Sequence, residues 1–159
     1  MIAVILVGVP CAGKSTFRSK FLEMNPDYVV CSSDDHIDKL CEQEGITYSD
    51  GFTQFIKQAE DNFQLQLNQA LIEDRNLIID RTNCSVNGRA KYIEKLRKAG
   101  YKVYAYYFEV PMNQLLIRLK KRGQETGKNI PFSVIQSMLK NYERPTDQEF
   151  DEVHDGTTF

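Results

Sequence analysis

The residues with the clearest chemical meaning lie near the start of the chain, in the segment Gly8-Val9-Pro10-Cys11-Ala12-Gly13-Lys14-Ser15-Thr16. Its spacing, G-x-x-x-x-G-K-S, is that of a phosphate-binding P-loop. The two glycines allow backbone conformations closed to other residues, and the amides that follow lie at a helix start, where anions bind. In such a loop Lys14 bridges the β- and γ-phosphates of a nucleotide, and the Ser15 hydroxyl is a Mg²⁺ ligand. The sequence therefore predicts binding of ATP with Mg²⁺ by Gly8, Ala12, Gly13, Lys14, Ser15 and Thr16.

A P-loop by itself does not separate kinases from switch or motor ATPases. A kinase also needs a general base beside the acceptor hydroxyl and cations around the transferred phosphoryl group. Asp34 and Asp35 follow a short apolar run and are candidates for the base. Adjacent aspartates are also common as helix caps or in solvated turns, so the residue types alone leave both interpretations open.

A cationic run near the middle of the second half of the chain consists of Arg118, Lys120, Lys121 and Arg122. Such a run is most often a solvated helix face. Arg118 and Arg122, however, are four residues apart and share one face of a helix, and the polar segment from Gly123 to Pro131 follows them. We therefore expect a helical lid at about 113–131 that brings both arginines to the phosphates of ATP.

Short apolar runs alternate with helical patterns along the chain. The predicted strands are Ile2–Val7, Tyr28–Cys31, Leu77–Asp80 and Val103–Phe108, with a weak fifth at Glu149–Val153. The predicted helices are Lys14–Glu23, Phe52–Glu73, Arg89–Ala99, Asn113–Lys121 and Ser133–Tyr142. This alternation predicts an α/β fold of the P-loop kinase type, a parallel sheet of about four or five strands between helices. Ligands of such sheets bind beyond the carboxyl ends of the strands, where the polar segments 8–15, 32–35 and 80–83 fall.

Composition limits the remaining classes of function. The 159 residues fit one domain, which we expect to span 1–159. No apolar run reaches the roughly 20 residues that cross a bilayer, so we expect no membrane partner. Four cysteines, far apart in the sequence, indicate no disulfide framework and favour a cytoplasmic protein. The net charge of -2 argues against electrostatic binding of nucleic acid over the whole surface, so any such binding must come from a local basic patch.

Several further segments follow the P-loop in a fixed order. They are Ser33-Asp34-Asp35, Asp80-x-Thr82-Asn83, Lys121-Arg122-Gly123, Ile130-Pro131-x-x-Val134-Ile135-x-Ser137-Met138 and Pro145-Thr146-x-x-Glu149-Phe150-Asp151. In this combination the chain resembles, from Ile5 to Val153, the kinase domain of bacteriophage polynucleotide kinase and its relatives among the P-loop kinases. The resemblance implies transfer of the γ-phosphate of ATP to a 5′-hydroxyl end of DNA or RNA. It also implies a location in the host cytoplasm if the chain is phage-encoded.

The resemblance implies roles for individual residues on the donor side. Asp34 is the general base that takes the acceptor proton. Lys14 and Arg122 stabilise the transferred phosphoryl group, and Arg118 contacts phosphate from the lid. Asp80, at the end of the third predicted strand, orients the water ligands of Mg²⁺.

The acceptor side, to which Thr82 and Asn83 also belong, departs from the family pattern at two positions. The family has an arginine three residues after the catalytic aspartate, where it holds the 3′-phosphate of the acceptor, but this chain has Ile37 there. The family has an acidic residue just before Thr-Asn, where this chain has Arg81. Arg81 either replaces the missing phosphate contact or is an ordinary charge at a strand end. Val153 stands where the phosphatase domain of the phage enzyme has its nucleophilic aspartate, so no phosphatase activity is expected.

Two other functions remain open from the sequence. One is a small-molecule kinase on the same scaffold that phosphorylates a nucleoside, sugar or antibiotic hydroxyl, which Ile37 and the mildly acidic charge favour. The other is a nucleotide-binding regulator that transfers nothing, against which Asp34 and the two lid arginines argue. The sequence does not choose between DNA and RNA, identify the residues that hold the adenine, or give the oligomeric state.

Overall fold

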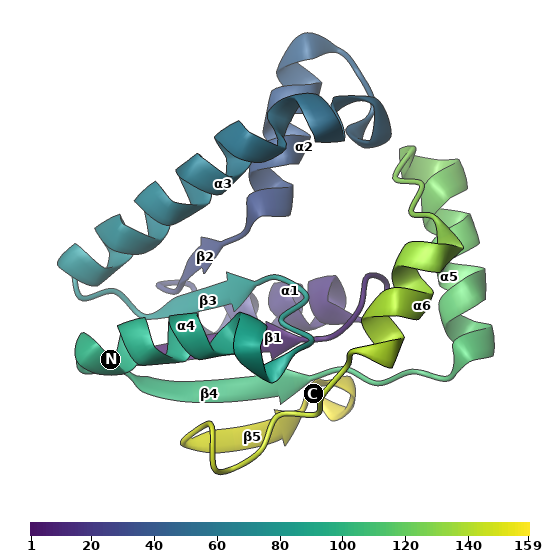
Figure 1. The fold of residues 1–159 in the computed structure, drawn as a ribbon. Helices are drawn as coiled ribbons and strands as arrows, with labels where there is room; N and C mark the ends of the chain where they lie inside the picture. The colour runs from purple at the N-terminus through teal and green to yellow at the C-terminus, as the bar shows by residue number, and fades with distance from the viewer.

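The central strand of the sheet is the first strand of the chain. In the computed structural model, which describes all residues 1–159, the strand order is β2-β3-β1-β4-β5 (Figure 1). The strands are β1 (Ile2–Val7), β2 (Val29–Cys31), β3 (Leu77–Asp80), β4 (Lys102–Tyr107) and β5 (Glu152–Asp155). Every neighbouring pair is parallel. This arrangement confirms the α/β fold that the alternating pattern predicts.

Six α-helices connect the strands. They are α1 (Lys14–Met24), α2 (Ser33–Glu44), α3 (Tyr48–Ile72), α4 (Val86–Lys98), α5 (Met112–Thr126) and α6 (Phe132–Lys140), and a short 3₁₀ turn (Gly156–Thr158) follows β5. None of these helices has the length and apolar character needed to span a membrane.

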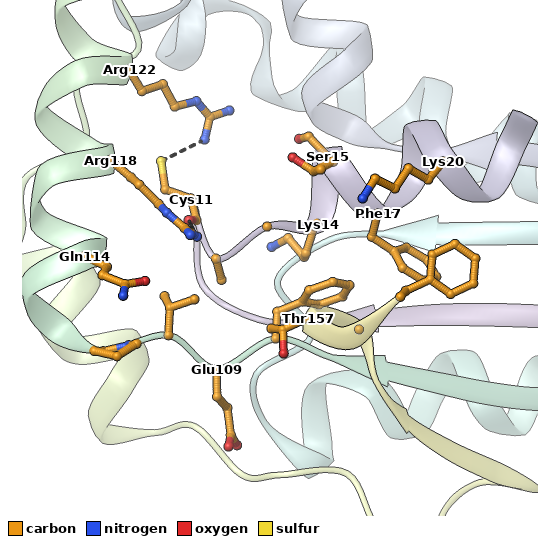
Figure 2. Close-up of a pocket in the computed structure, with 18 residues that line it drawn as sticks. Cys11, Lys14, Ser15, Phe17, Lys20, Glu109, Gln114, Arg118, Arg122 and Thr157 are labelled. Carbon is orange, nitrogen blue, oxygen red and sulfur yellow. Dashed lines mark hydrogen bonds between the residues drawn. The ribbon is translucent and has the colours of Figure 1, made fainter.

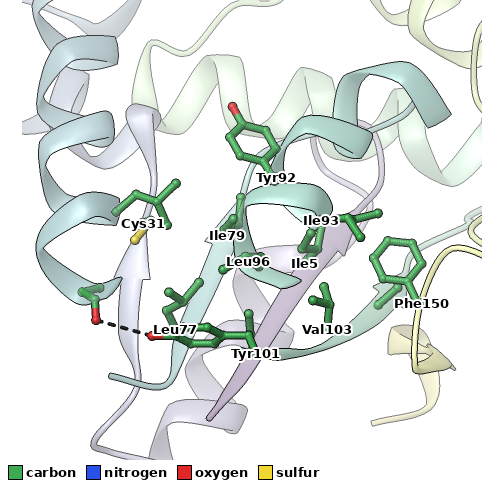
Figure 3. Close-up of a cluster of buried hydrophobic side chains, with 14 of the residues drawn as sticks. Ile5, Cys31, Leu77, Ile79, Tyr92, Ile93, Leu96, Tyr101, Val103 and Phe150 are labelled. Atoms are coloured by element: carbon green, nitrogen blue, oxygen red, sulfur yellow. Dashed lines mark hydrogen bonds between the residues drawn. The ribbon is translucent and has the colours of Figure 1, made fainter. Parts of the chain in front are cut away.

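Helices cover both faces of the sheet. On one face α3 and α4 pack Phe63 and Leu96, among others, against alternate strand residues such as Ile5 (Figure 3). On the other face Phe17 of α1 belongs to a second core, to which β1 contributes Leu6. Successive residues of a strand point to opposite faces, so the apolar run of β1 is buried on both sides. Polar chemistry is therefore confined to the ends of the strands.

Helix α2 is the main element that the sequence analysis missed. The segment Ser32–Asp35, expected as a polar strand end, forms its first turn, and the Ser32 side chain accepts a hydrogen bond of 3.3 Å from the Asp35 amide. Only Ser33, Ile37 and Cys41 of this helix are buried, which is too short an apolar stripe to stand out in the sequence. Ile37 packs in a small core with α3, which explains why no arginine can occupy that position here.

Three predicted boundaries also need correction. Helix α3 begins four residues before Phe52, because the Thr47 side chain accepts a hydrogen bond of 3.2 Å from the Asp50 amide and caps the helix there. Helix α5 continues beyond Lys121 to Thr126 and ends at Gly127, whose φ of 70° is left-handed, so the first part of the polar segment from Gly123 to Pro131 is helical. Strand β5 starts at Glu152, because residues 146–150 form a turn instead.

Arg89 of α4 is completely buried beneath the carboxyl end of β3. It forms an ion pair with Glu149 through two hydrogen bonds of 2.8 and 3.0 Å. Its guanidinium also donates to the backbone carbonyls of Asn83, Cys84 and Glu143. A buried charge with this many partners joins α4, the strand end and the segment before β5 into one unit.

We expect Arg89→Ala to lower the free energy of unfolding by about 3–5 kcal/mol, because it leaves the Glu149 carboxylate and three carbonyls without their buried donor. Urea unfolding followed by circular dichroism measures the change. Lys98→Ala is the control, since Lys98 lies on the same helix in an exposed pair with Glu94 and should leave the unfolding midpoint nearly unchanged. Equal effects of the two substitutions would contradict a structural role for Arg89.

Candidate active site

The P-loop is the turn between β1 and α1. Gly13 has a φ of 113°, a conformation that glycine adopts without strain. A Cβ added at Gly8 would lie 3.1 Å from the Cβ of Phe108, so glycine is also required for the close approach of β4. The backbone amides of residues 13–16 have no hydrogen-bond acceptor within the chain. Four unpaired amides at the start of a helix are able to bind an anion, and the motif predicts that phosphate binds at this place.

A cavity of about 760 Å³ lies beside these amides (Figure 2). Its other walls are residues 108–111 after β4, the lid helix α5 and the C-terminal turn. This volume is in the range of cofactor and nucleotide sites. Glu109, Gln114 and Thr157 also line this cavity, and no local pattern in the sequence singles them out.

Arg118 and Arg122 reach this cavity from α5, as predicted (Figure 2). Arg118 donates to the Cys11 carbonyl at 3.3 Å, and Arg122 donates to the Cys11 sulfur at 3.6 Å. Lys14 donates to the Gly8 carbonyl. Burial lowers the pKa of the Lys14 ammonium, while the negative charges of Asp80 and Asp34 oppose that shift. None of these three cations forms an ion pair with a carboxylate, so each is available to phosphate.

A second cavity, of about 480 Å³, meets the first at Lys14, Ser15 and Arg122, which line both. Asp34 lies in its wall, on the first turn of α2. The lid and α6 form the opposite wall with Ile130, Pro131, Val134 and Met138. A molecule bound here therefore lies between a carboxylate and the phosphate end of the first cavity, as a phosphoryl acceptor must.

The structure distinguishes the two adjacent aspartates. Asp35 forms an ion pair with Arg18 at 3.1 Å. Asp34 accepts a hydrogen bond of 2.5 Å from the Tyr48 hydroxyl through one oxygen, and its other oxygen has no partner within the chain. Burial and the Asp34 carboxylate raise the pKa of Tyr48, so the phenol remains a hydrogen-bond donor. Asp34 is thus held in place by Tyr48 and keeps one oxygen without a partner, whereas Asp35 is bound to Arg18.

The residues predicted to serve Mg²⁺ lie together at the junction of the cavities. Asp80 ends β3 beside β1, accepts a hydrogen bond of 2.8 Å from Arg18 and lines the second cavity with Ser15. Burial raises the pKa of Asp80, while Lys14 and Arg18 counteract that rise. The Ser15 hydroxyl has no partner within the chain. One hydroxyl and one nearby carboxylate fit a Mg²⁺ ion that keeps most of its ligands from phosphate and water.

The predicted acceptor residues after β3 occupy different positions. Arg81 lines the second cavity, but both of its terminal nitrogens bind Glu60 of α3, at 2.8 and 2.6 Å. Burial opposes the charge of Arg81, yet the hydrogen bonds to Glu60 raise the pKa of the guanidinium. Thr82 also lines the cavity. Asn83 is buried behind it and donates its side-chain amide to the Leu6 carbonyl at 2.9 Å, so its direct role is in joining β3 to β1.

The lid contacts the α2–α3 pair through residues that the sequence analysis did not select. Lys128 forms an ion pair of 2.7 Å with Asp38 of α2 and lies 4.7 Å from the centre of the Tyr48 ring. The Ser49 hydroxyl donates to the Gly127 carbonyl at 2.6 Å. These partners are more than seventy positions apart in sequence, so no local signal could have found them.

Comparison with known proteins places the chain among P-loop proteins. Residues 4–145 match the AAA domain family AAA_33. The chain is 27% identical over 146 residues to the L-seryl-tRNA(Sec) kinase of Methanococcus maripaludis, covering 89% of this chain and 52% of that protein. It is 30% identical over 147 residues to the shikimate kinase of Clostridium botulinum, covering 87% of this chain and 78% of that protein. The chain thus spans about half the length of the first of these relatives.

A solved structure of a protein from Chloroflexus aurantiacus j-10-fl has the same fold, with a TM-score of 0.73 and 15% identity over 97% of this chain and 83% of that chain. The comparisons support the resemblance inferred from the motifs at the level of the P-loop kinases and do not single out polynucleotide kinase. The family match covers most of the chain, and the protein therefore belongs to the AAA domain family AAA_33 and has the fold of the P-loop kinases.

Proposed function

We propose that this chain is an ATP-dependent kinase that phosphorylates a hydroxyl group of a small molecule. The observation that carries the proposal is the junction of two cavities at Lys14, Ser15 and Arg122, with Asp34 in the wall of the second. The two relatives are kinases named for seryl-tRNA(Sec) and shikimate, which agrees with a hydroxyl acceptor.

In the proposed reaction the acceptor lies in the second cavity, with its hydroxyl proton directed at the free oxygen of Asp34. The hydroxyl oxygen forms a bond to the γ-phosphorus of ATP while the bond from that phosphorus to the bridging oxygen of ADP breaks, and the proton passes to Asp34. Lys14 and Arg122 neutralise the charge of the transferred group, and the amides of residues 13–16 hold the phosphates. Bound Mg²⁺ at Ser15 and Asp80 would add to this neutralisation.

The size and enclosure of the second cavity favour a small acceptor over a polynucleotide. Its volume of about 480 Å³ suits a molecule of the size of a sugar or a nucleoside. The Lys128–Asp38 ion pair and the Ser49–Gly127 hydrogen bond join the lid to α2 and α3 along its wall.

A 5′-hydroxyl end of DNA or RNA is the second candidate acceptor. It is favoured by a neighbouring cleft of about 310 Å³ that shares Arg81, Thr82 and Met138 with the acceptor cavity and extends to Lys91 on α4. Such a cleft offers a path for the part of a longer acceptor that follows the reacting hydroxyl. A seryl group carried on a tRNA would have the same requirement.

The proposal is tested by incubating the protein with γ-labelled ATP, Mg²⁺ and a panel of acceptors. The panel contains sugars, polyols, nucleosides, amino alcohols, shikimate, and DNA and RNA oligonucleotides with 5′-hydroxyl ends. We expect at least one small molecule to be labelled with a kcat/KM at least about tenfold above that of either oligonucleotide, because the cavity volume of about 480 Å³ suits a small acceptor. Labelling of an oligonucleotide alone would instead establish the second candidate.

We expect Asp34→Asn to lower kcat by about 10²–10⁴-fold and to leave the KM for ATP nearly unchanged, because it removes the proton acceptor but no ATP contact. Steady-state kinetics with the best acceptor of the panel measures both quantities. Asp35→Asn is the matched comparison, since its carboxylate is bound to Arg18. If Asp35→Asn were the inactive variant and Asp34→Asn active, the assignment of the base would be wrong.

We expect Arg122→Lys to lower kcat almost as much as Arg122→Ala. Lysine keeps the charge but loses the planar fork that can hold two phosphoryl oxygens at once. Lys121→Ala on the same helix is the control, because the Lys121 side chain is exposed and lines neither cavity. Full activity of Arg122→Lys would show that only diffuse positive charge is needed at this position.

A further inference from the structure

The cations on the two sides of the site differ in whether they are already paired. On the ATP side, Lys14, Arg118 and Arg122 form no ion pair with any carboxylate. On the acceptor side, every cation that lines the second cavity and is not shared with the first has a carboxylate partner within 4 Å; these cations are Arg18, Arg81 and Lys128.

Each of these acceptor-side cations is held by its partners. Arg81 binds both oxygens of Glu60 with its two terminal nitrogens, and its guanidinium lies 4.9 Å from the centre of the Phe63 ring. This bidentate geometry occupies the face of an arginine that would otherwise bind a carboxylate or a phosphate. Arg18 lies between two carboxylates, Asp35 at 3.1 Å and Asp80 at 2.8 Å.

Lys128 is held in a similar way on the lid. Its ammonium is 2.7 Å from Asp38 and 4.7 Å from the centre of the Tyr48 ring, so a carboxylate and an aromatic face both stabilise its charge. Releasing it to a ligand would also break the contact between lid and α2. No cation that lines the second cavity alone is therefore free for a negatively charged substrate.

The carboxylates outnumber the cations once ATP is bound. Lys14 and Arg122 then serve the phosphates, and Asp80 serves Mg²⁺. The remaining three cations face four carboxylates, namely Asp34, Asp35, Asp38 and Glu60. An anionic acceptor would meet this excess of like charge and the triphosphate, and it would have to displace a carboxylate from its partner. An uncharged acceptor meets neither obstacle, and an ammonium group would be attracted.

We propose, on the basis of the function proposed above, that the acceptor is an uncharged or positively charged alcohol, such as a polyol, a nucleoside or an amino alcohol. Glu60 and Asp38 exclude anionic alcohols because they hold Arg81 and Lys128 in ion pairs. In this respect the chain differs from a kinase for an acidic substrate. The same pair argues against the hypothesis that Arg81 holds a 3′-phosphate, because Glu60 binds the two terminal nitrogens that the phosphate would need.

The test uses acceptors that differ in charge but share the reacting hydroxyl. Suitable pairs are adenosine with 3′-AMP, methyl shikimate with shikimate, and 1-amino-1-deoxyglucitol with gluconate. Phosphorylation is measured with ATP and Mg²⁺, and binding is measured by isothermal titration with Mg²⁺ and a non-hydrolysable ATP analogue. We expect the uncharged or cationic member of each pair that is bound to have an affinity at least about tenfold higher than the anionic member.

Two variants test the cause of this preference. Glu60→Gln frees Arg81, and Asp38→Asn frees Lys128 if the first variant fails to fold. We expect either change to shift the ratio of affinities toward the anion by at least about fivefold, the effect of Glu60→Gln being largest for 3′-AMP. Asp61→Asn is the matched control, because Asp61 is exposed on the same helix as Glu60 and lines neither cavity; it should leave the ratio unchanged.

The two measurements separate this inference from the proposed function. Binding of the uncharged members without phosphorylation of any small molecule would contradict the proposed function and support the inference. Phosphorylation of small molecules with the anionic members preferred would support the proposed function and contradict the inference. Failure of every uncharged and cationic probe to bind, or an unchanged ratio in both Glu60→Gln and Asp38→Asn, would overturn the inference.

Discussion

The site depends on how the carboxyl ends of β1 and β3 are joined. The Gly8 amide donates to the Thr82 carbonyl at 2.9 Å, and the Asn83 side chain donates to the Leu6 carbonyl at the same distance. Asn83 has a left-handed φ of 48°, which costs about 1–3 kcal/mol for such a residue, and the bonds from buried Arg89 to its carbonyl and to that of Cys84 offset this strain. The P-loop and the end of β3 are therefore fixed relative to each other. The amides, Lys14 and Asp80 are therefore already in position to bind phosphate and Mg²⁺, without rearrangement.

The parts of the fold that were predictable are those in which local sequence and tertiary position agree. The apolar run of β1, the glycines of the P-loop and the alternation of strands and helices gave the parallel sheet and its active edge. Asp34 was selected because parallel strands end on one side of a sheet, and Arg118 and Arg122 were selected because they share one face of a helix. Helix α2 could not be found in this way, since its apolar residues are few and its first turn consists of the polar residues expected to line the site.

The partners of the charged residues were not predictable for a different reason. Arg81 was selected as a cation at the correct strand end. Whether its guanidinium is available to a ligand, however, depends on Glu60, a residue of α3 far away in the sequence. Lys128 and Asp38 are 90 positions apart and meet only because the lid folds back toward α2. Sequence shows where a charge lies along the chain, whereas its availability to a ligand depends on such pairs. The separation between unpaired cations for ATP and paired cations beside the acceptor is therefore visible only in the structure.

The lid and the Asp34 carboxylate, the proposed base, are linked through one aromatic ring. Tyr48 donates its hydroxyl to Asp34, and the Lys128 ammonium of the lid lies over the same ring. Ser49, the next residue of α3, binds the Gly127 carbonyl of the lid. The contacts that close the acceptor cavity are thus adjacent to the one that orients the carboxylate. A lid displaced from α2 would lose Lys128 from the Tyr48 ring at the same time as it exposed the second cavity to water. Closure of the proposed acceptor cavity and orientation of the Asp34 carboxylate therefore depend on the same few residues.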